Sequence, residues 1–300
     1  MNWTSTAILS AAILGMVNII DSHLLSRRMP GFRAFLLPVS IIHLIYASLF
    51  LYLFPLPEGA GIWPVLAAVA SGILRTSAVI IMLYNFIKKE VSRVIPVVYT
   101  YPIFVAIMAI PLLGETLHYL EWLAIIIVVA GAVIVSAEES PSGATRWPGK
   151  PFLLLFVSSL FFAIADVATK YVLAYISFWN MFSITAFCMA VIFLLISLRP
   201  HVLRDLGGMN RRNPVLALLA FNETLAPVGI VLSFWAMQRG PVSLVSTVIG
   251  SRPVFVAIFS LAVSYIFPRF LMRPASGKML ALRLLATVMI FCGISIIYLT

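Results

Sequence analysis

Residues 91–107 read VSRVIPVVYTYPIFVAI, and residues 242–258 read VSLVSTVIGSRPVFVAI. Nine of the seventeen aligned positions are identical, including one proline (Pro102 and Pro253) and the last four residues of each stretch. Two apolar segments share Val, Ile, Leu and Ala through composition alone, but a shared Pro and a shared Ser are harder to obtain by chance. We therefore interpret the two stretches as an internal duplication.

The composition is that of a membrane protein with several spans. Of 300 residues, 62% are hydrophobic and 10% are charged, with a mean hydropathy of +1.10, whereas a globular chain carries roughly 25% charged residues. A helix of roughly 20 apolar residues spans a bilayer. Ten such segments are predicted, over residues 5–26, 34–54, 63–87, 92–113, 119–137, 152–175, 178–198, 214–238, 242–267 and 279–299. We expect an all-α integral membrane fold.

The duplication extends over the whole chain. The sequence PVLA at residues 64–67 recurs at 214–217, and a polar linker at 138–150 separates the two halves. We predict a first repeat over residues 1–137 and a second over 151–300. With five helices per repeat, the second copy must enter the membrane in the opposite orientation. Inverted repeats of this kind are common in secondary transporters, where the binding site lies near the midplane between the repeats.

The basic residues indicate an orientation. Sixteen of the 20 Lys and Arg residues fall in the predicted loops 1–2, 3–4, 5–6, 7–8 and 9–10. The opposite loops carry Arg239 with Glu58, Glu115 and Glu121. Because positive loops stay in the cytoplasm, this pattern predicts that both termini face outward. The net charge of +10 is thereby explained without a nucleic-acid partner.

Six ionisable residues lie within predicted apolar segments: Asp21, Arg75, Asp166, Lys170, Glu223 and Arg252. Charges at membrane depth are costly and usually face the interior of the bundle. Asp166 and Lys170 are four residues apart, which favours an ion pair on one helix face. Asp21 lies close to the Arg27-Arg28 pair, so snorkelling or pairing at the interface would explain it.

Arg75 is too central in its segment to reach water by snorkelling. Glu223 lies in the corresponding segment of the other half, so an Arg75–Glu223 ion pair between the halves is one arrangement that the sequence allows. Such a pair would be a charged gate or a substrate-headgroup site. The alternative is a buried pair that fixes helix register.

The site proper is predicted where the two copies differ. Tyr99-Thr100-Tyr101 in the first copy corresponds to Gly250-Ser251-Arg252 in the second. Each triplet precedes a helix-breaking proline (Pro102, Pro253), and Arg252 is the best candidate for contacting a substrate carboxylate. The candidate lining of a substrate cavity is Tyr84, Tyr99, Tyr101, Trp235, Ser251 and Arg252. The candidates for gating or for a charge pair are the other five ionisable residues of the apolar segments: Asp21, Arg75, Asp166, Lys170 and Glu223.

Several sites are not encoded. The sequence has no G-x-x-x-x-G-K-[ST] phosphate loop, no H-E-x-x-H, no C-x-x-C and no G-x-S-x-G, so we expect no ATP-driven pump, no enzyme, no metal and no cofactor. Cys188 and Cys292 lie in apolar runs, which predicts no disulfide. His43 is either a protonation switch or a hydrogen-bonded structural histidine.

One pattern resembles a known family. The first half reads Val91-Ser92-x-Val94-x-Pro96, then Pro102, Leu113-Gly114-Glu115-Thr116-Leu117 and Gly131. This order resembles the EamA-type domain of the drug/metabolite transporter superfamily. The second half keeps the matching residues Ser243, Val245, Pro253 and Gly293, but it has Thr247 in place of Pro96 and Ser264-Tyr265 in place of Gly114-Glu115.

The resemblance implies a ten-helix transporter in the bacterial inner membrane that moves small metabolites by alternating access. Similar chains include bacterial exporters of amino acids, aromatic ones among them. An amino acid or similar amphipathic metabolite, surrounding lipid and a monomeric state are therefore expected. A multidrug exporter of cationic compounds is the alternative, and a lipid-modifying membrane enzyme is a third hypothesis from another class. Some relatives are described with cytoplasmic termini, which is the opposite of the orientation that the loop charges predict.

Overall fold

The computed structural model describes residues 2–88, 94, 97–135, 150–209, 212–266 and 277–299, and the regular secondary structure in these ranges is helical. The helices are α1 (Trp3–His23), the π-helical turn η1 (Leu24–Arg28), α2 (Phe32–Leu53), α3 (Ile62–Lys88), α5 (Tyr101–Leu113), α6 (Tyr119–Val135), α7 (Lys150–Val172), α8 (Phe178–Ser197), α9 (Pro200–Gly207), α10 (Arg212–Arg239), α11 (Val242–Ile249), α12 (Arg252–Ile266) and α13 (Gly277–Leu299). The linker at 138–149, Val91-Ser92 and Pro96 lie outside the described residues.

The described helices are suited to a bilayer. Seven helical stretches are long and apolar enough to cross a membrane, and three shorter apolar helices accompany them, at Tyr101–Leu113, Tyr119–Ile134 and Leu284–Leu299. Large side chains on the outside of the bundle, such as Tyr52, Trp63 and Leu195, are 85%, 74% and 71% exposed. A surface this apolar is favourable only when hydrocarbon covers it. The structure thus agrees with the predicted multi-pass membrane protein.

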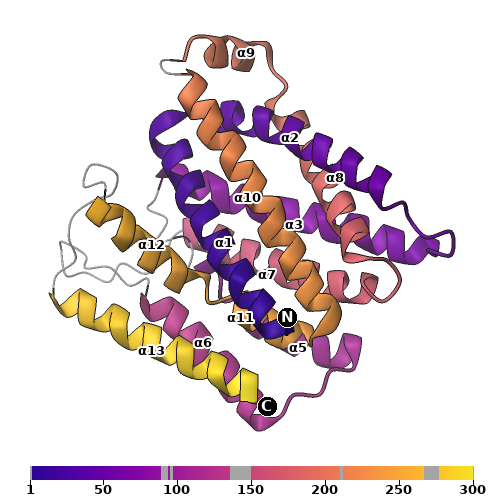
Figure 1. Ribbon diagram of the computed structural model, residues 1–300, viewed down its shortest axis with the longest axis vertical. Helices are drawn as coiled ribbons and strands as arrows, with labels where there is room; N and C mark the ends of the chain where they lie inside the picture. The colour runs from indigo at the N-terminus through magenta and orange to yellow at the C-terminus, as the bar shows by residue number, and fades with distance from the viewer. Residues whose placement is uncertain are drawn as a thin grey trace.

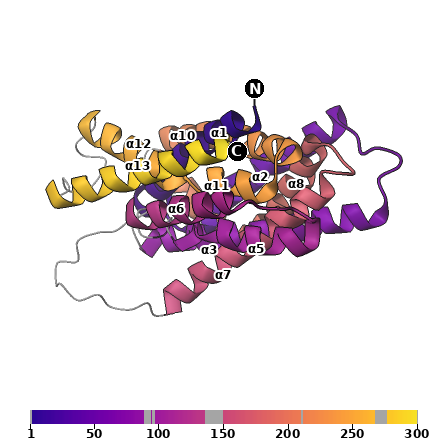
Figure 2. The same cartoon turned by 90° about the horizontal axis from the view of Figure 1, so that it is seen from below.

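Four helix pairs build the bundle, and each joins the first half of the chain to the second. As Figures 1 and 2 show, α1 packs along α10, α2 along α8, α3 along α7, and α6 along α13. The main core of buried side chains runs through the first three pairs. A smaller core joins α6 and α13 to α12 through Val128, Ala132, Val254, Ile290 and Ile294.

Two glycines let α6 and α13 approach closely. A side chain on Gly131 would meet Ile290 Cγ1 at 2.6 Å and the Ala286 carbonyl oxygen at 3.0 Å. A side chain on Gly293 would meet Val128 Cγ2 at 2.6 Å and the Ala124 carbonyl oxygen at 3.1 Å. Small residues let helix backbones come together where lipid supplies no hydrophobic drive for association. The glycine that carries the family resemblance in each half, Gly131 or Gly293, therefore lies at the contact between α6 and α13.

The duplicated segments are broken next to their prolines. The single helix predicted over 242–267 is two helices, α11 and α12, separated by Gly250 and Ser251. Pro253 is the second residue of α12, and Pro102 is the second residue of α5. Proline lacks an amide hydrogen and is tolerated in the first turn of a helix, so each helix restarts there. A side chain on Gly250 would meet Pro102 Cγ at 2.9 Å, so the two breaks touch.

Candidate functional site

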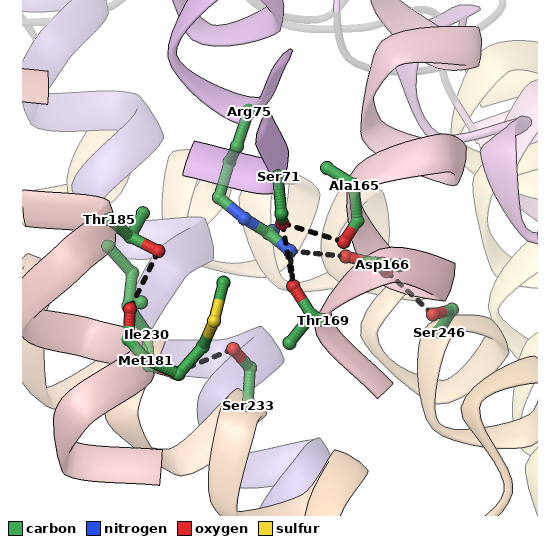
Figure 3. Close-up of polar contacts among 10 residues, drawn as sticks. All are labelled: Ser71, Arg75, Ala165, Asp166, Thr169, Met181, Thr185, Ile230, Ser233 and Ser246. Carbon is green, nitrogen blue, oxygen red and sulfur yellow. Dashed lines mark hydrogen bonds and ion pairs between the residues drawn. The ribbon is translucent and has the colours of Figure 1, made fainter. Parts of the chain in front are cut away.

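An arginine from the first half of the chain is bound to an aspartate from the second. Arg75 of α3 donates from Nη2 to Asp166 Oδ1 of α7 at 2.7 Å, and to Thr169 Oγ1 at 3.3 Å (Figure 3). Asp166 accepts a further hydrogen bond from Ser246 of α11, 2.6 Å from its Oδ2. Asp166 is almost completely buried. Three helices are thus joined through one ion pair.

Only one edge of the Arg75 guanidinium is occupied by that pair. Its Nε is buried and has no hydrogen-bond partner among the described residues. The Phe234 ring lies under the guanidinium, with 5.0 Å between Cζ and the ring centroid. Figure 3 shows Met181, Thr185 and Ser233 on the side of Arg75 away from Asp166. The guanidinium therefore keeps a donor, Nε, that no described residue accepts from.

The hydroxyl groups on this surface keep acceptor capacity. Thr185 donates to the Met181 carbonyl at 2.8 Å, and Ser233 donates to the Ile230 carbonyl at 2.7 Å. Each hydroxyl uses its single hydrogen in this way and retains oxygen lone pairs. Sequence reasoning missed both residues, because Ser and Thr in apolar helices commonly bond to their own backbone and give no pattern of their own.

The two ion pairs expected from the sequence are wrong. Lys170 does not pair with Asp166: its Nζ donates to the carbonyls of Met237 and Gly240, both at 2.8 Å. These carbonyls end α10 and lack partners within the helix, so they attract a cation. Arg75 likewise pairs with Asp166 and not with Glu223. The partner was misassigned because α3 packs along α7, which the sequence does not reveal.

A second arginine centre lies at the broken helices. Arg252, the first residue of α12, donates from Nη1 to the Tyr99 hydroxyl at 2.6 Å and lies 5.0 Å from the Tyr99 ring centroid. Asn18 of α1 also donates to that hydroxyl, at 3.4 Å. The Tyr101 ring packs 5.9 Å from that of Tyr99 and 6.0 Å from that of Phe162, centroid to centroid. Tyr99 and Tyr101 thus form an aromatic pair next to Arg252.

A third polar cluster joins α1, α2 and α10. Asn222 donates to Asp21 Oδ1 at 2.7 Å, and the same nitrogen lies 3.5 Å from Glu223 Oε1. His43 Nδ1 is 3.5 Å from Glu223 Oε2 and 3.0 Å from the Val39 carbonyl. The expectation that Asp21 snorkels toward Arg27 is wrong. Asp21 is 7% exposed because its side chain faces α10, away from the basic end of α1.

The remaining lining candidates make other contacts. Tyr84 is 42% exposed and packs edge-on against Phe32 at 5.7 Å. Trp235 lies under Arg239, 4.0 Å from ring centroid to Cζ. Ser251 is buried and donates to the Val248 carbonyl at 2.6 Å, which closes the turn between α11 and α12. Of the predicted lining, Tyr99, Tyr101 and Arg252 are together.

No group of three or more His, Cys, Asp or Glu side chains in the described ranges could hold a metal ion. Cys188 is buried and Cys292 is exposed, and both are free thiols. The polar chemistry that the structure does show consists of cations, carboxyl groups, hydroxyls and aromatic rings. Such groups bind and orient a small polar ligand within an apolar bundle.

The family model for the EamA-like transporter family matches residues 1–137 and 149–299, which is nearly the whole chain in two halves. The chain belongs to the EamA-like transporter family. This is a family of membrane transporters and not of enzymes, so the protein is a multi-pass membrane protein of transporter type. No curated protein sequence matches the chain.

The fold of this EamA-like chain is also found among solved structures. One crystal structure superposes with a TM-score of 0.68 over 99% of this chain and 95% of the other, at 18% sequence identity. At that identity the similarity concerns the fold alone. It extends over nearly the full length of both chains, so no large additional domain separates them.

The loop motif of the EamA-like first half also has a defined structural role. Gly114 ends α5 with a left-handed backbone, φ 69°. Glu115 then accepts from the amides of Val242 and Ser243, at 2.6 and 3.2 Å, and from the Ser243 hydroxyl at 2.5 Å. A carboxylate at a helix N-terminus satisfies free amides and opposes the helix dipole. Sequence analysis placed Glu115 among the loop charges and in the family motif, and the structure shows that it ties the first half to the start of α11.

Proposed function

We propose that this transporter exports amino acids, aromatic or other apolar ones in particular, by alternating access between two inverted five-helix halves. The seven long apolar helices together with the three shorter ones would make the ten spans that this topology needs. In the two halves, α1 corresponds to α7 and α3 corresponds to α10. Exchanging the halves therefore converts the α1–α10 pair into the α7–α3 pair, and both pairs are main contacts of the bundle. The α2–α8 and α6–α13 pairs each join counterparts and would lie on the axis that relates the halves.

The surface around Arg75 carries the proposal for the substrate. An amino acid presents a carboxylate, an ammonium group and a side chain. The free edge of the Arg75 guanidinium would take the carboxylate, since the planar guanidinium binds carboxylates through two parallel hydrogen bonds. The hydroxyl oxygens of Thr185 and Ser233 would accept from the ammonium group. Phe234 and Met181 would cover the apolar side chain.

The Arg75 side chain is held in place by its ion pair and is partly accessible to a ligand. Its salt bridge to Asp166 fixes one amino group, so little side-chain entropy is lost when a ligand binds to the other edge. The Arg75 side chain is 12% exposed while that of Asp166 is 2% exposed, so a ligand has access to the cation and not to its partner. The buried Arg75 Nε, which has no hydrogen-bond partner among the described residues, is the single observation that favours a carboxylate substrate.

A cationic drug suits this surface less well. A cation placed beside Arg75 and Arg252 would be repelled by both guanidinium groups, and at membrane depth such repulsion is weakly screened. The carboxyl pair of Asp21 and Glu223 would attract a cation. Both residues are buried where α1, α2 and α10 meet, so a large drug would have to separate these helices to reach them.

Counterflow in proteoliposomes tests the proposed substrate class. Vesicles preloaded with unlabelled L-phenylalanine, L-leucine, L-lysine or L-glutamate would be diluted into trace labelled L-phenylalanine, with ethidium uptake measured in parallel. We expect label to accumulate above the level of empty vesicles with phenylalanine or leucine inside. Ethidium uptake without amino-acid counterflow would instead identify a cation exporter, and no flux of any amino acid would reject the proposal.

A further inference from the structure

The Asp21 cluster has chemistry that the substrate surface does not use. It lies in the contact between α1 of the first half and α10 of the second. Two carboxyl groups and an amide share it: the Asn222 amide nitrogen is 2.7 Å from Asp21 and 3.5 Å from Glu223. All three side chains are at most 7% exposed. One nitrogen thus holds two potential negative charges close together in a nonpolar region.

No described cation neutralises these two carboxyl groups. Arg75 and Arg252 are engaged by Asp166 and Tyr99, and Lys170 by backbone carbonyls. Arg27 and Arg28 at the end of α1 are exposed. The ionisable groups that face the pair from the packed helices are His43, which contacts Glu223, and Tyr46, which is within Coulombic range of it. A doubly ionised pair would therefore be an uncompensated buried charge, which is strongly unfavourable.

The hydrogen bonds show a shortage of donors in the same cluster. His43 Nδ1 carries its hydrogen toward the Val39 carbonyl, so a neutral His43 has an acceptor at Nε2. That Nε2 and Asn222 Oδ1 are both buried and have no partner among the described residues. Two unfilled acceptors thus lie on the two residues that contact the carboxyl groups. An added proton removes one negative charge and supplies one donor.

We propose that Asp21, Asn222, Glu223 and His43 form a proton-binding site in which the two carboxyl groups share one proton taken from water. Because one amide nitrogen contacts both carboxyl groups in a buried site, their protonation is coupled and belongs to the pair. Proton release would leave two carboxylates on facing helices of opposite halves, and their repulsion would weaken the α1–α10 contact. Proton binding restores the contact. The site is separate from the Arg75 surface.

The consequence for transport rests on the proposed function: a contact that opens and closes with proton occupancy would couple export to a pH gradient. The site itself does not depend on the identity of the substrate. It therefore has its own test, infrared spectroscopy of the purified full-length protein in D2O, where a protonated carboxyl group gives a C=O stretch distinct from that of carboxylate. The variants are the double replacement Asp21→Asn/Glu223→Gln and the control Asp205→Asn, an exposed acid of α9.

We expect wild-type protein and the Asp205→Asn control to show a protonated-carboxyl band at pH 7, and the double variant to lose it. A wild-type spectrum without such a band at pH 7 would overturn the site, and so would a band unchanged in the double variant. Loss of the wild-type band when sodium chloride replaces potassium chloride at fixed pH would assign the site to a metal cation instead. Thermal melting of each variant checks that it is folded.

A second measurement addresses coupling. In proteoliposomes, efflux of L-phenylalanine under an imposed pH gradient is compared with exchange at equal pH. The Glu223→Gln variant should exchange phenylalanine at equal pH as the wild type does. The factor by which the pH gradient accelerates its efflux should be at least tenfold smaller than in the wild type. Wild-type efflux that ignores the gradient would overturn the coupling. Absence of any phenylalanine flux would reject the proposed substrate while the infrared result still decides the proton site.

Discussion

Replacing Asp166 with asparagine should destabilise the protein through the charge left on Arg75. The substitution keeps the volume of the side chain and removes its negative charge. In the native structure Asp166 accepts from Arg75 at 2.7 Å and from Ser246 at 2.6 Å, and it is 1% exposed. Removing one partner of a buried ion pair costs roughly 3–5 kcal/mol because the other charge remains buried.

The lower end of that range applies here. The asparagine oxygen can still accept from Arg75, and the Arg75 side chain is 12% exposed, so solvent compensates part of the loss. We expect a loss of about 3 kcal/mol, which at roughly 2 °C per kcal/mol for a large chain lowers Tm by about 6 °C. The assay is fluorescence-detected thermal melting of purified protein in detergent. Asp205→Asn, on the exposed helix α9, is the matched control and should melt like the wild type.

The double variant Arg75→Met/Asp166→Leu completes the cycle. Exchanging both members of a buried pair for apolar residues is often neutral, so this variant should recover most of the lost Tm while it abolishes transport. The coupling between the two positions is then measurable from the wild type, Arg75→Met, Asp166→Leu and the double variant. An Asp166→Asn protein that melts like the wild type, or a double variant less stable than either single one, would show that the ion pair does not hold α3 to α7.

Three further changes have defined outcomes. Glu115→Ala leaves the first amides of α11 without their acceptor and should cost about 1–2 kcal/mol, measured by thermal melting against Glu58→Ala in an exposed loop; equal melting of the two would contradict the role of Glu115. Gly131→Val should push α6 away from α13 and lower Tm. The control Gly59→Val places its side chain where no atom lies within 4 Å and should leave Tm unchanged. A folded Gly131→Val protein with the wild-type Tm would refute the close packing. Tyr99→Phe removes the acceptor for Arg252 and Asn18 and should cost about 1–3 kcal/mol, a value that chemical unfolding of the two proteins would measure.

Much of the architecture was predictable because membrane helices leave a strong one-dimensional signal. Apolar length marked the helices, and the duplicated prolines marked where α5 and α12 begin. The eight-residue helix α9 was missed because it is too short and too polar to give that signal. The π-helical turn at Leu24–Arg28 was missed because its residues also suit an ordinary helix end.

The charged residues of the candidate site were predictable, but their partners and the hydroxyl and apolar residues near Arg75 were not. Any ionisable residue in an apolar segment must find a partner or a polar surface, which singled out Arg75, Asp166, Glu223 and Arg252. Which residue serves as partner depends on helix rotation and on which helices are neighbours. A pair at positions i and i+4 such as Asp166 and Lys170 gives a local answer, but the free carbonyls at the end of α10 compete for Lys170.

Counterflow with a substrate and its analogue without a carboxylate tests the role of Arg75 most directly. Wild-type vesicles and Arg75→Lys vesicles would be compared for L-phenylalanine and for phenethylamine, with the exposed Arg239→Lys as the matched control. Lysine keeps the charge beside Asp166 but lacks the second edge of the guanidinium. Loss of one charge-assisted hydrogen bond of roughly 1.5–3 kcal/mol should reduce the preference of the wild type for phenylalanine by about tenfold or more in Arg75→Lys, and Arg239→Lys should keep it. An unchanged preference in Arg75→Lys would show that the carboxylate binds elsewhere.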